Sequence, residues 1–315
     1  MGQAPATTSA IGNAPALTLR RKRWSQAQLA YLLNAPALIL ILVLTIYPIV
    51  DAFWVSLHQY NLRQPTVFTF VGLQNYLTLL ETSDFWNALS VTLLFTFWST
   101  ILVLAIALTV ALVLNEPFRG RGFMRALILL PWAMPGVVNA LMWQWVFNGQ
   151  VGILNGILYS LGLIDHYRAW LVDSSTMYPS LIFANVWNTF PFSALILLAA
   201  LQAVPSELYD AARVDRASVF DRFRYVTLPW LVHPILIVLI LQTLGGLRLF
   251  DIIYLLTGGG PGNATTTIGY AAYQTAFLDF DFGLGNAYSY IIAVLTLIIA
   301  LVYMRILWNR GDVTS

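Results

Sequence analysis

Residues 88–114 read ALSVTLLFTFWSTILVLAIALTVALVL, an apolar stretch of 27 residues that contains no charged side chain. About 20 apolar residues in a helix are enough to cross the roughly 30 Å hydrocarbon layer of a bilayer. Across the 315 residues of the chain, 59% of the side chains are hydrophobic and 10% are charged, whereas soluble domains carry about 25% charged residues. The sequence therefore predicts a helical membrane protein and excludes the disordered, collagenous and nucleic-acid-binding classes.

Six stretches, including this one, are apolar over a length sufficient to span the membrane. They cover residues 29–50, 88–114, 126–147, 177–204, 228–256 and 283–304. We therefore predict an all-α polytopic fold with six transmembrane helices, in which residues 29–315 form one transmembrane domain. Residues 1–28 are predicted to form a disordered tail, because their first part is rich in Ala, Pro, Thr and Ser.

The Lys and Arg residues are concentrated in alternate connections between the predicted spans. Of the 16, 13 precede the first span or follow the second, fourth and sixth. Because short loops rich in Lys and Arg remain in the cytoplasm, both termini are predicted to be cytoplasmic. A cleaved signal peptide is a weaker interpretation of the N-terminus, since the apolar run after Arg23 is longer than a signal-peptide core and contains Pro36 and Pro48.

Residues that carry chemistry are few. The chain contains no cysteine, its three histidines are far apart in sequence, and its single lysine follows no glycine-rich loop. These facts exclude disulfides and thiolate catalysis, give no support to a metal site, and exclude a phosphate-binding loop that ends in Gly-Lys-Ser/Thr. No catalytic residue and no bound cofactor are predicted, so a membrane enzyme is unsupported. Any ATP, with its Mg²⁺, must bind to another polypeptide.

Residues 205–229 form the longest polar segment on the predicted cytoplasmic side. Four acidic and four basic residues lie there among apolar ones: Glu207, Asp210, Arg213, Asp215, Arg216, Asp221, Arg222 and Arg224. A segment that binds anionic lipid would carry one sign of charge. Balanced charges among apolar side chains are instead typical of short helices that bind a protein. The alternative is a solvated loop between two helices.

The same segment carries a spaced motif, in which Asp210-Ala211-Ala212 is followed by three residues, Arg216, nine residues and Val226-Thr227-Leu228-Pro229. This motif resembles the EAA loop of binding-protein-dependent ABC importer permeases, Glu-Ala-Ala, three residues, Gly, nine residues, Ile-x-Leu-Pro. The resemblance implies a coupling helix seated in a cytoplasmic ATPase dimer. The residues that the resemblance implies would contact the ATPase are Glu207, Asp210, Ala211, Ala212, Arg213, Asp215 and Arg216. Arg216 replaces a glycine that lets the chain turn, so we expect either an ordinary helical conformation there or a contact with the ATPase.

Motifs elsewhere extend the resemblance over nearly the whole chain. They are Ala35-Pro36, Tyr47-Pro48, residues 70–76 (FVGLQNY), Leu130-Pro131 with Pro135, and residues 256–261 (LTGGGP). The last two are similar to the carbohydrate branch, in which maltose-type and glycerol-3-phosphate-type permeases pair with a second, homologous permease. The family implies a type I ABC importer fold among the lipids of a bacterial or archaeal plasma membrane. It also implies an extracytoplasmic solute-binding protein, facing a flexible outer loop at residues 258–262.

Polar residues inside the fourth predicted span share one helical face. Asn185, Asn188 and Thr189 lie there with Phe192. Amides and a hydroxyl beside an aromatic ring suit a sugar, and the resemblance places all four positions at sugar contacts. Hydrogen bonding between helices is the alternative.

The fifth predicted span contains Gln242, Arg248 and Asp251. Arg248 and Asp251, three positions apart on a helix, are predicted to form an ion pair. The alternative is a place on the translocation path, which the resemblance implies for Gln242, and Arg248 would also suit a phosphate. The predicted function is one half of the pathway for a sugar, with a di- or oligosaccharide preferred. A glycerol-3-phosphate or polyol importer is the alternative, and an ion-coupled carrier is less favoured because intramembrane charges are few.

Overall fold

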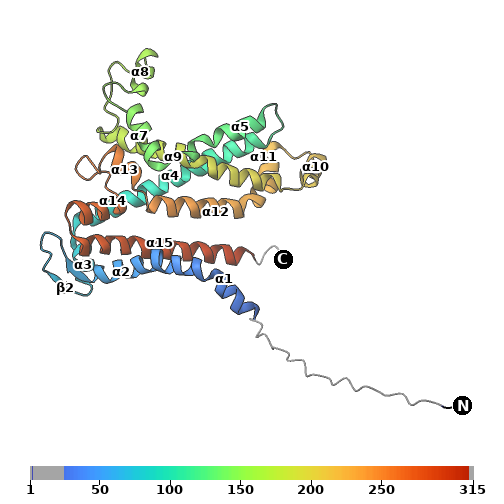
Figure 1. Ribbon diagram of the computed structural model, residues 1–315. Coiled ribbons are helices and arrows are strands. Elements are labelled where there is room, and N and C mark those ends of the chain that lie inside the picture. The colour runs from blue at the N-terminus through green and yellow to red at the C-terminus, as the bar shows by residue number, and fades with distance from the viewer. Residues whose placement is uncertain (1, 3–24, 312–315) are drawn as a thin grey trace. The chain divides into compact units, whose positions relative to one another are not determined.

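The computed structural model describes residue 2 and residues 25–311 (Figure 1). The predicted tail of residues 1–28 lies almost entirely outside these residues. The chain divides into two units, Met1–Asp51 and Ala52–Ser315. In the first unit, α1 (Gln26–Ile41) continues through one π-helical turn (Leu42–Ile46) into the start of α2 (Tyr47–Ser56). Within this run, residues 30–56 form a helix that is long and apolar enough to cross a membrane.

The second unit contains a two-stranded sheet and the remaining helices. The strands are β1 (His58–Tyr60) and β2 (Phe68–Phe70). The helices are α3 (Gln74–Glu81), α4 (Ser83–Asn115), α5 (Arg121–Ile128), α6 (Leu130–Ala133), α7 (Gly136–Val146), α8 (Ile153–Ser160), α9 (Ser174–Gln202), α10 (Ser206–Val214), α11 (Val219–Arg222), α12 (Leu228–Leu247), α13 (Asp251–Leu256), α14 (Ile268–Tyr273) and α15 (Phe282–Gly311). Two further π-helical turns cover Phe223–Thr227 and Gln274–Leu278. The fold is therefore mostly helical, and the small sheet is a departure from the all-α prediction.

Close packing of α4 against α9 and α12 forms the centre of the second unit (Figure 1). Ala107 and Ala111 of α4 are fully buried in one cluster with Leu231 of α12. Nearer the other end of α12, a methyl group added to Gly246 would lie 2.7 Å from the hydroxyl of Thr96. Small residues thus let the backbones of these helices approach closely, as is common where helices pack inside a membrane.

Two of the six predicted spans are interrupted. Among the described residues, five helices are long and apolar enough to cross a membrane, and the third predicted span qualifies only as a helix pair bent by 93°. The bend lies at Met134, which is extended because a residue before proline disfavours the helical region. The fifth predicted span, residues 228–256, is likewise two helices, since α12 ends at Leu247 and α13 begins at Asp251.

The motif at residues 70–76 connects the sheet to α3 through hydrogen bonds. Phe70 pairs with His58 across the two strands. The side-chain amide of Asn75 donates to the carbonyls of Ser56 and His58, at 2.8 and 2.9 Å. The hydroxyl of Tyr76 lies 2.6 Å from that of Ser56. The motif therefore positions the chain immediately after α2.

The loop between α13 and α14 is held by threonine side chains. Thr265 donates to the carbonyl of Gly260, and Thr266 to that of Gly259. The hydroxyl of Thr257 lies 2.8 Å from that of Thr265, and all three threonines 265–267 are buried. The loop at residues 258–262, predicted to be flexible, is thus held at the carbonyls of Gly259 and Gly260 by the buried threonines that follow it.

The N-terminus of α9 is fixed by an aspartate. The carboxylate of Asp173 accepts hydrogen bonds from the backbone N–H and the hydroxyl of Ser175, at 2.9 and 2.8 Å. These two hydrogen bonds hold the pKa of Asp173 below its usual value. Aspartate is among the strongest N-cap residues because it satisfies amides that the first helical turn leaves free.

Candidate solute pathway and coupling surface

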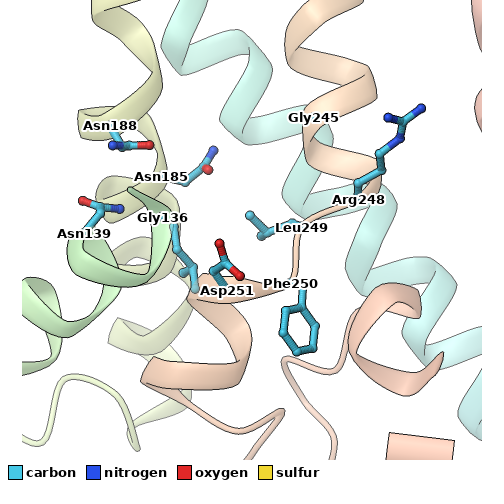
Figure 2. A pocket seen from close by; sticks show the side chains of 10 residues that line it. Gly136, Asn139, Asn185, Asn188, Gly245, Arg248, Leu249, Phe250 and Asp251 are labelled. Atoms are coloured by element: carbon cyan, nitrogen blue, oxygen red, sulfur yellow. The ribbon is translucent and has the colours of Figure 1, made fainter. Parts of the chain in front are cut away.

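A cavity of about 210 Å³ lies where α7, α9 and the break between α12 and α13 meet (Figure 2). Ten residues line it: Gly136, Asn139, Asn185, Asn188, Gly245, Arg248, Leu249, Phe250, Asp251 and Ile252. We name it the central cavity. Four of the seven residues predicted on the substrate path, Asn185, Asn188, Arg248 and Asp251, are brought together here.

Three asparagine amides face the central cavity with their nitrogens already engaged. Asn185 donates to the hydroxyl of Ser99 at 2.6 Å, and Asn188 donates to the carbonyl of Pro131 at 2.6 Å. Asn139 is 0% exposed and donates to a carbonyl of α9 at 3.4 Å. The side-chain oxygen of Asn139 has no partner among the described residues. That oxygen is enclosed by protein, so the polar groups that a solute could contact are those of Asn185, Asn188, Arg248 and Asp251.

Arg248 and Asp251 line the same cavity but do not pair. Among the described residues, the one ion pair joins Arg213 and Asp210. Figure 2 shows the guanidinium of Arg248 directed away from Asp251. The predicted ion pair is wrong because it assumed a continuous helix, whereas α12 ends before Arg248 and Phe250 has φ −134°.

The carboxylate of Asp251 lies instead against the N-terminus of α7. A methyl group added to Gly136, the first residue of α7, would lie 2.5 Å from Oδ2 of Asp251. Helix N-termini carry partial positive charge from unpaired N–H groups. The bend at Pro135 therefore places a favourable electrostatic environment beside an intramembrane carboxylate, and glycine at position 136 leaves the space for it.

The other three predicted path residues are engaged elsewhere. Thr189 donates to the carbonyl of Asn185 in its own helix at 2.9 Å. Phe192 stacks on Trp132, with ring centroids 4.9 Å apart. Gln242 donates to the hydroxyl of Ser193 at 2.9 Å. This contact joins α12 to α9. The helix-to-helix bonding that the sequence left as an alternative for the fourth span is made by Asn185, to α4, and by Asn188, to α6.

Six of the ten lining residues were not predicted as site residues. Two of them, Gly136 and Asn139, belong to the third predicted span, which was predicted as one uninterrupted apolar helix. The available signals were a proline beside a glycine at residues 135–136 and an amide one turn later. Both are typical of an interrupted helix that lines a cavity.

The predicted coupling segment is a pair of short, exposed helices. In α10, Arg213 and Asp210 form an ion pair at 3.1 Å, with both side chains 63% exposed, so the pair contributes well under about 1 kcal/mol. Glu207 lies in the first turn of α10, and Ala211, Asp215 and Arg216 are exposed, whereas Ala212 is half-buried. The second helix, α11, starts at a capping box formed by Ser218 and Asp221.

Exposed apolar residues accompany these charges. Val214, Val219 and Phe220 are all exposed, and large exposed apolar side chains beside charged ones are typical of a protein-binding surface. Tyr209 links the segment to the rest of the unit, since its hydroxyl lies 3.1 Å from that of buried Thr227, at the start of α12.

Arg216 occupies the turn between α10 and α11 in a left-handed conformation, with φ 57°. The N–H of Ala217 donates to the carbonyl of Ala212 at 2.9 Å, and the N–H of Arg216 donates to that of Arg213 at 3.1 Å. This pair of bonds is the Schellman motif that ends many helices, usually with glycine at the left-handed position. The expectation of an ordinary helical conformation is therefore wrong, because the turn keeps the geometry of the family's glycine.

A family model described as "Binding-protein-dependent transport system inner membrane component" matches residues 101–307. The chain belongs to this family. The trehalose/maltose transport system permease protein MalF of Thermococcus litoralis is 43% identical over 92% of this chain and 97% of its own length. The trehalose transport system permease protein SugA of Mycobacterium tuberculosis is 36% identical, over 90% of each chain. These relatives confirm the predicted permease family and a transport subunit rather than an enzyme.

The fold is also found in a solved transporter. A bacterial ABC transporter involved in the import of alginate has a chain that superposes with a TM-score of 0.76, at 23% identity, covering 88% of this chain and 94% of that one. The superposition confirms the type I ABC importer fold. Of the six predicted spans, five are helices of sufficient length among the described residues, or six if the bent pair is counted as one span. The chain is an inner membrane component of a transport system.

Proposed function

We propose that this chain forms one half of the translocation pathway of an ATP-driven importer for a sugar, with a di- or oligosaccharide preferred. The central cavity carries the proposal, because the side-chain amides of Asn185 and Asn188 line it beside Arg248 and Asp251. Solute hydroxyl groups would form hydrogen bonds with these polar side chains. The names of the relatives, which mention trehalose, maltose and sulfoquinovosyl glycerol, support the same class of solute.

The energy for import would come from a separate ATPase dimer that binds ATP and Mg²⁺. Its contact would be α10 and α11, where exposed apolar and charged side chains lie around the turn at Arg216. A second, homologous permease would complete the pathway, and a solute-binding protein would deliver the solute from outside. This arrangement requires the coupling segment and both termini to lie in the cytoplasm, as the distribution of Lys and Arg favours.

A glycerol-3-phosphate importer is the second candidate. The observation that favours it is Arg248, whose guanidinium lines the cavity and forms no ion pair with any described residue. Arg recognises phosphate through paired N–H donors. The carboxylate of Asp251 in the same cavity opposes this candidate, because it would repel a phosphate group.

The test is uptake by the complete importer in liposomes, with radiolabelled trehalose, maltose and glycerol-3-phosphate offered separately. We expect ATP-dependent uptake of a disaccharide, a large loss in Asn188→Leu, whose side chain is half-buried and lines the central cavity, and little change in the control Asn87→Ala, whose side chain donates to a loop carbonyl outside that cavity. The purified chain alone should hydrolyse no ATP. Uptake by the chain alone on an ion gradient would contradict the proposal.

A further inference from the structure

A second cavity, of about 360 Å³, adjoins the central cavity. Phe250 lines both of them, so the two share a wall at the break between α12 and α13. The second cavity is lined by three more aromatic rings, Tyr273, Phe277 and Phe282, and by the polar side chains of Asn286 and Ser289. We name it the aromatic cavity.

The rings of the aromatic cavity form a connected row. The ring centroids of Phe250 and Tyr273 are 5.1 Å apart, those of Tyr273 and Phe277 are 5.4 Å apart, and those of Phe277 and Phe282 are 5.7 Å apart. Phe250 also stacks on Tyr254, with 5.3 Å between centroids, and Tyr254 contacts Tyr273 at 5.4 Å. Offset and edge contacts at these distances are favourable and hold the rings in place.

Two polar groups complete the lining. Asn286 donates to the carbonyl of Phe282 at 2.8 Å, and the hydroxyl of Ser289 donates to that of Gly285 at 3.1 Å. With these donors engaged inside α15, the side-chain oxygens are left as acceptors. Ring faces with a few fixed acceptors suit the apolar C–H face of a sugar ring and its hydroxyl groups.

We propose that the aromatic cavity is a second sugar-ring subsite, so that a solute of two or more rings extends across Phe250 from the aromatic cavity into the central cavity. This inference rests on the proposed function, because it assumes that the central cavity takes a sugar. The competing interpretation is an aromatic belt at the membrane surface. A belt would need neither a cavity shared with the central one nor acceptors between the rings.

The test compares Tyr273→Ala and Phe277→Ala with Phe97→Ala in the complete importer reconstituted in lipid nanodiscs and liposomes. Phe277 and Phe97 are 57% and 56% exposed, and Phe97 lines neither cavity, so loss of an exposed ring alone affects both variants equally. The probes are maltose and trehalose. Their binding is measured by saturation-transfer NMR, and their uptake by a radiolabel. Tyr273→Phe retains the ring and serves as the conservative variant.

We expect each alanine variant at 273 and 277 to raise the KM for disaccharide uptake about three- to tenfold and to weaken saturation transfer to one ring of the sugar. Phe97→Ala and Tyr273→Phe should behave like the wild type. Equal behaviour of Phe277→Ala and Phe97→Ala, with normal wild-type uptake, overturns the subsite and leaves the proposed function standing. A wild-type importer that neither binds nor takes up either disaccharide overturns the proposed function and this inference with it.

Discussion

Replacing Arg216 with glycine tests the left-handed turn between α10 and α11. A left-handed conformation costs a residue with a side chain about 1–2 kcal/mol, and Arg216 adopts it with φ 57°. Glycine avoids that cost but loses about 0.5–1 kcal/mol more backbone entropy when it is ordered. The difference between the two terms predicts that Arg216→Gly stabilises the turn by about 0.5–1 kcal/mol.

Hydrogen exchange measures this turn directly. The N–H of Ala217 closes the longer loop of the Schellman motif, at 2.9 Å from the carbonyl of Ala212, and it exchanges only when the turn opens. Because about 1.4 kcal/mol corresponds to a tenfold change in an equilibrium constant, exchange at Ala217 should slow by about two- to fivefold. The comparison is made with the purified complex, after correction for the intrinsic exchange rates of the two sequences.

A matched control exists in the same chain. Gly162 ends α8 with φ 67°, and the N–H of Leu163 donates to the carbonyl of Leu158 at 2.9 Å. A methyl group added to Gly162 would meet no atom within 4 Å, so Gly162→Ala changes the backbone preference alone. Exchange at Leu163 should become about two- to fivefold faster, by the same difference of terms. If Gly162→Ala behaves in this way while Ala217 in Arg216→Gly exchanges at its original rate or faster, the reasoning about Arg216 is refuted.

Three further predictions follow from packing, hydrogen bonding and charge. Gly246→Ala should destabilise the contact of α12 with α4 by about 1–3 kcal/mol, which would be measured as a lower Tm. Adding Thr96→Ala should restore part of the lost stability, because it removes two of the three atoms closest to the new methyl group. Asn155→Ala should lower the free energy of unfolding by about 2–4 kcal/mol, because buried Asn155 makes hydrogen bonds to two backbone segments, at Asn148 and Arg168, and to the indole of Trp170. The loss should be visible in the fluorescence of Trp170, and Asn148→Ala should cost less. The depressed pKa of Asp173 means that its cap stabilises α9 fully above the ordinary aspartate range. This stabilisation is lost as the pH falls through the pKa of the folded state, so amide exchange at Ser175 should accelerate in acid. Asp173→Asn should abolish this pH dependence while still capping α9.

The lengths of the apolar helices could be predicted from the sequence, but their interruptions could not. Counting apolar residues detects that a segment belongs in the membrane, and it is insensitive to a change in direction within the segment. Residues 126–147 contain the Met134-Pro135-Gly136 bend, and residues 228–256 contain the break at Arg248. Apolar residues continue on both sides of each interruption, so an apolar count does not detect it. The local signals, Pro135-Gly136 in the first stretch and Gly245-Gly246 with Arg248 in the second, indicate where a helix can end but not the direction that the chain then takes.

The candidate site was predicted only in part, because the prediction assumed that each span was one continuous helix. Asn185 and Asn188 were correctly grouped with each other, because they lie on the uninterrupted helix α9 and the helical period applies to them. Arg248 and Asp251 were paired wrongly, because that period does not apply across a break. The partner of Asp251 is instead the N-terminus of α7 at Gly136, which is more than 100 residues away in the sequence and carries no charge that a sequence pattern could reveal.

The position of α12 has a mechanical consequence. The helix begins beside Thr227, whose hydroxyl contacts Tyr209 of the coupling segment, and it ends at Arg248 in the wall of the central cavity. Its 20 residues make a rigid arm about 30 Å long, so a tilt of about five degrees at the Thr227 end swings the Arg248 end by about 2.6 Å. That swing is nearly the length of a hydrogen bond. In the proposed importer, a small tilt of α12 at its Thr227 end would therefore be enough to break or form a hydrogen bond in the wall of the central cavity.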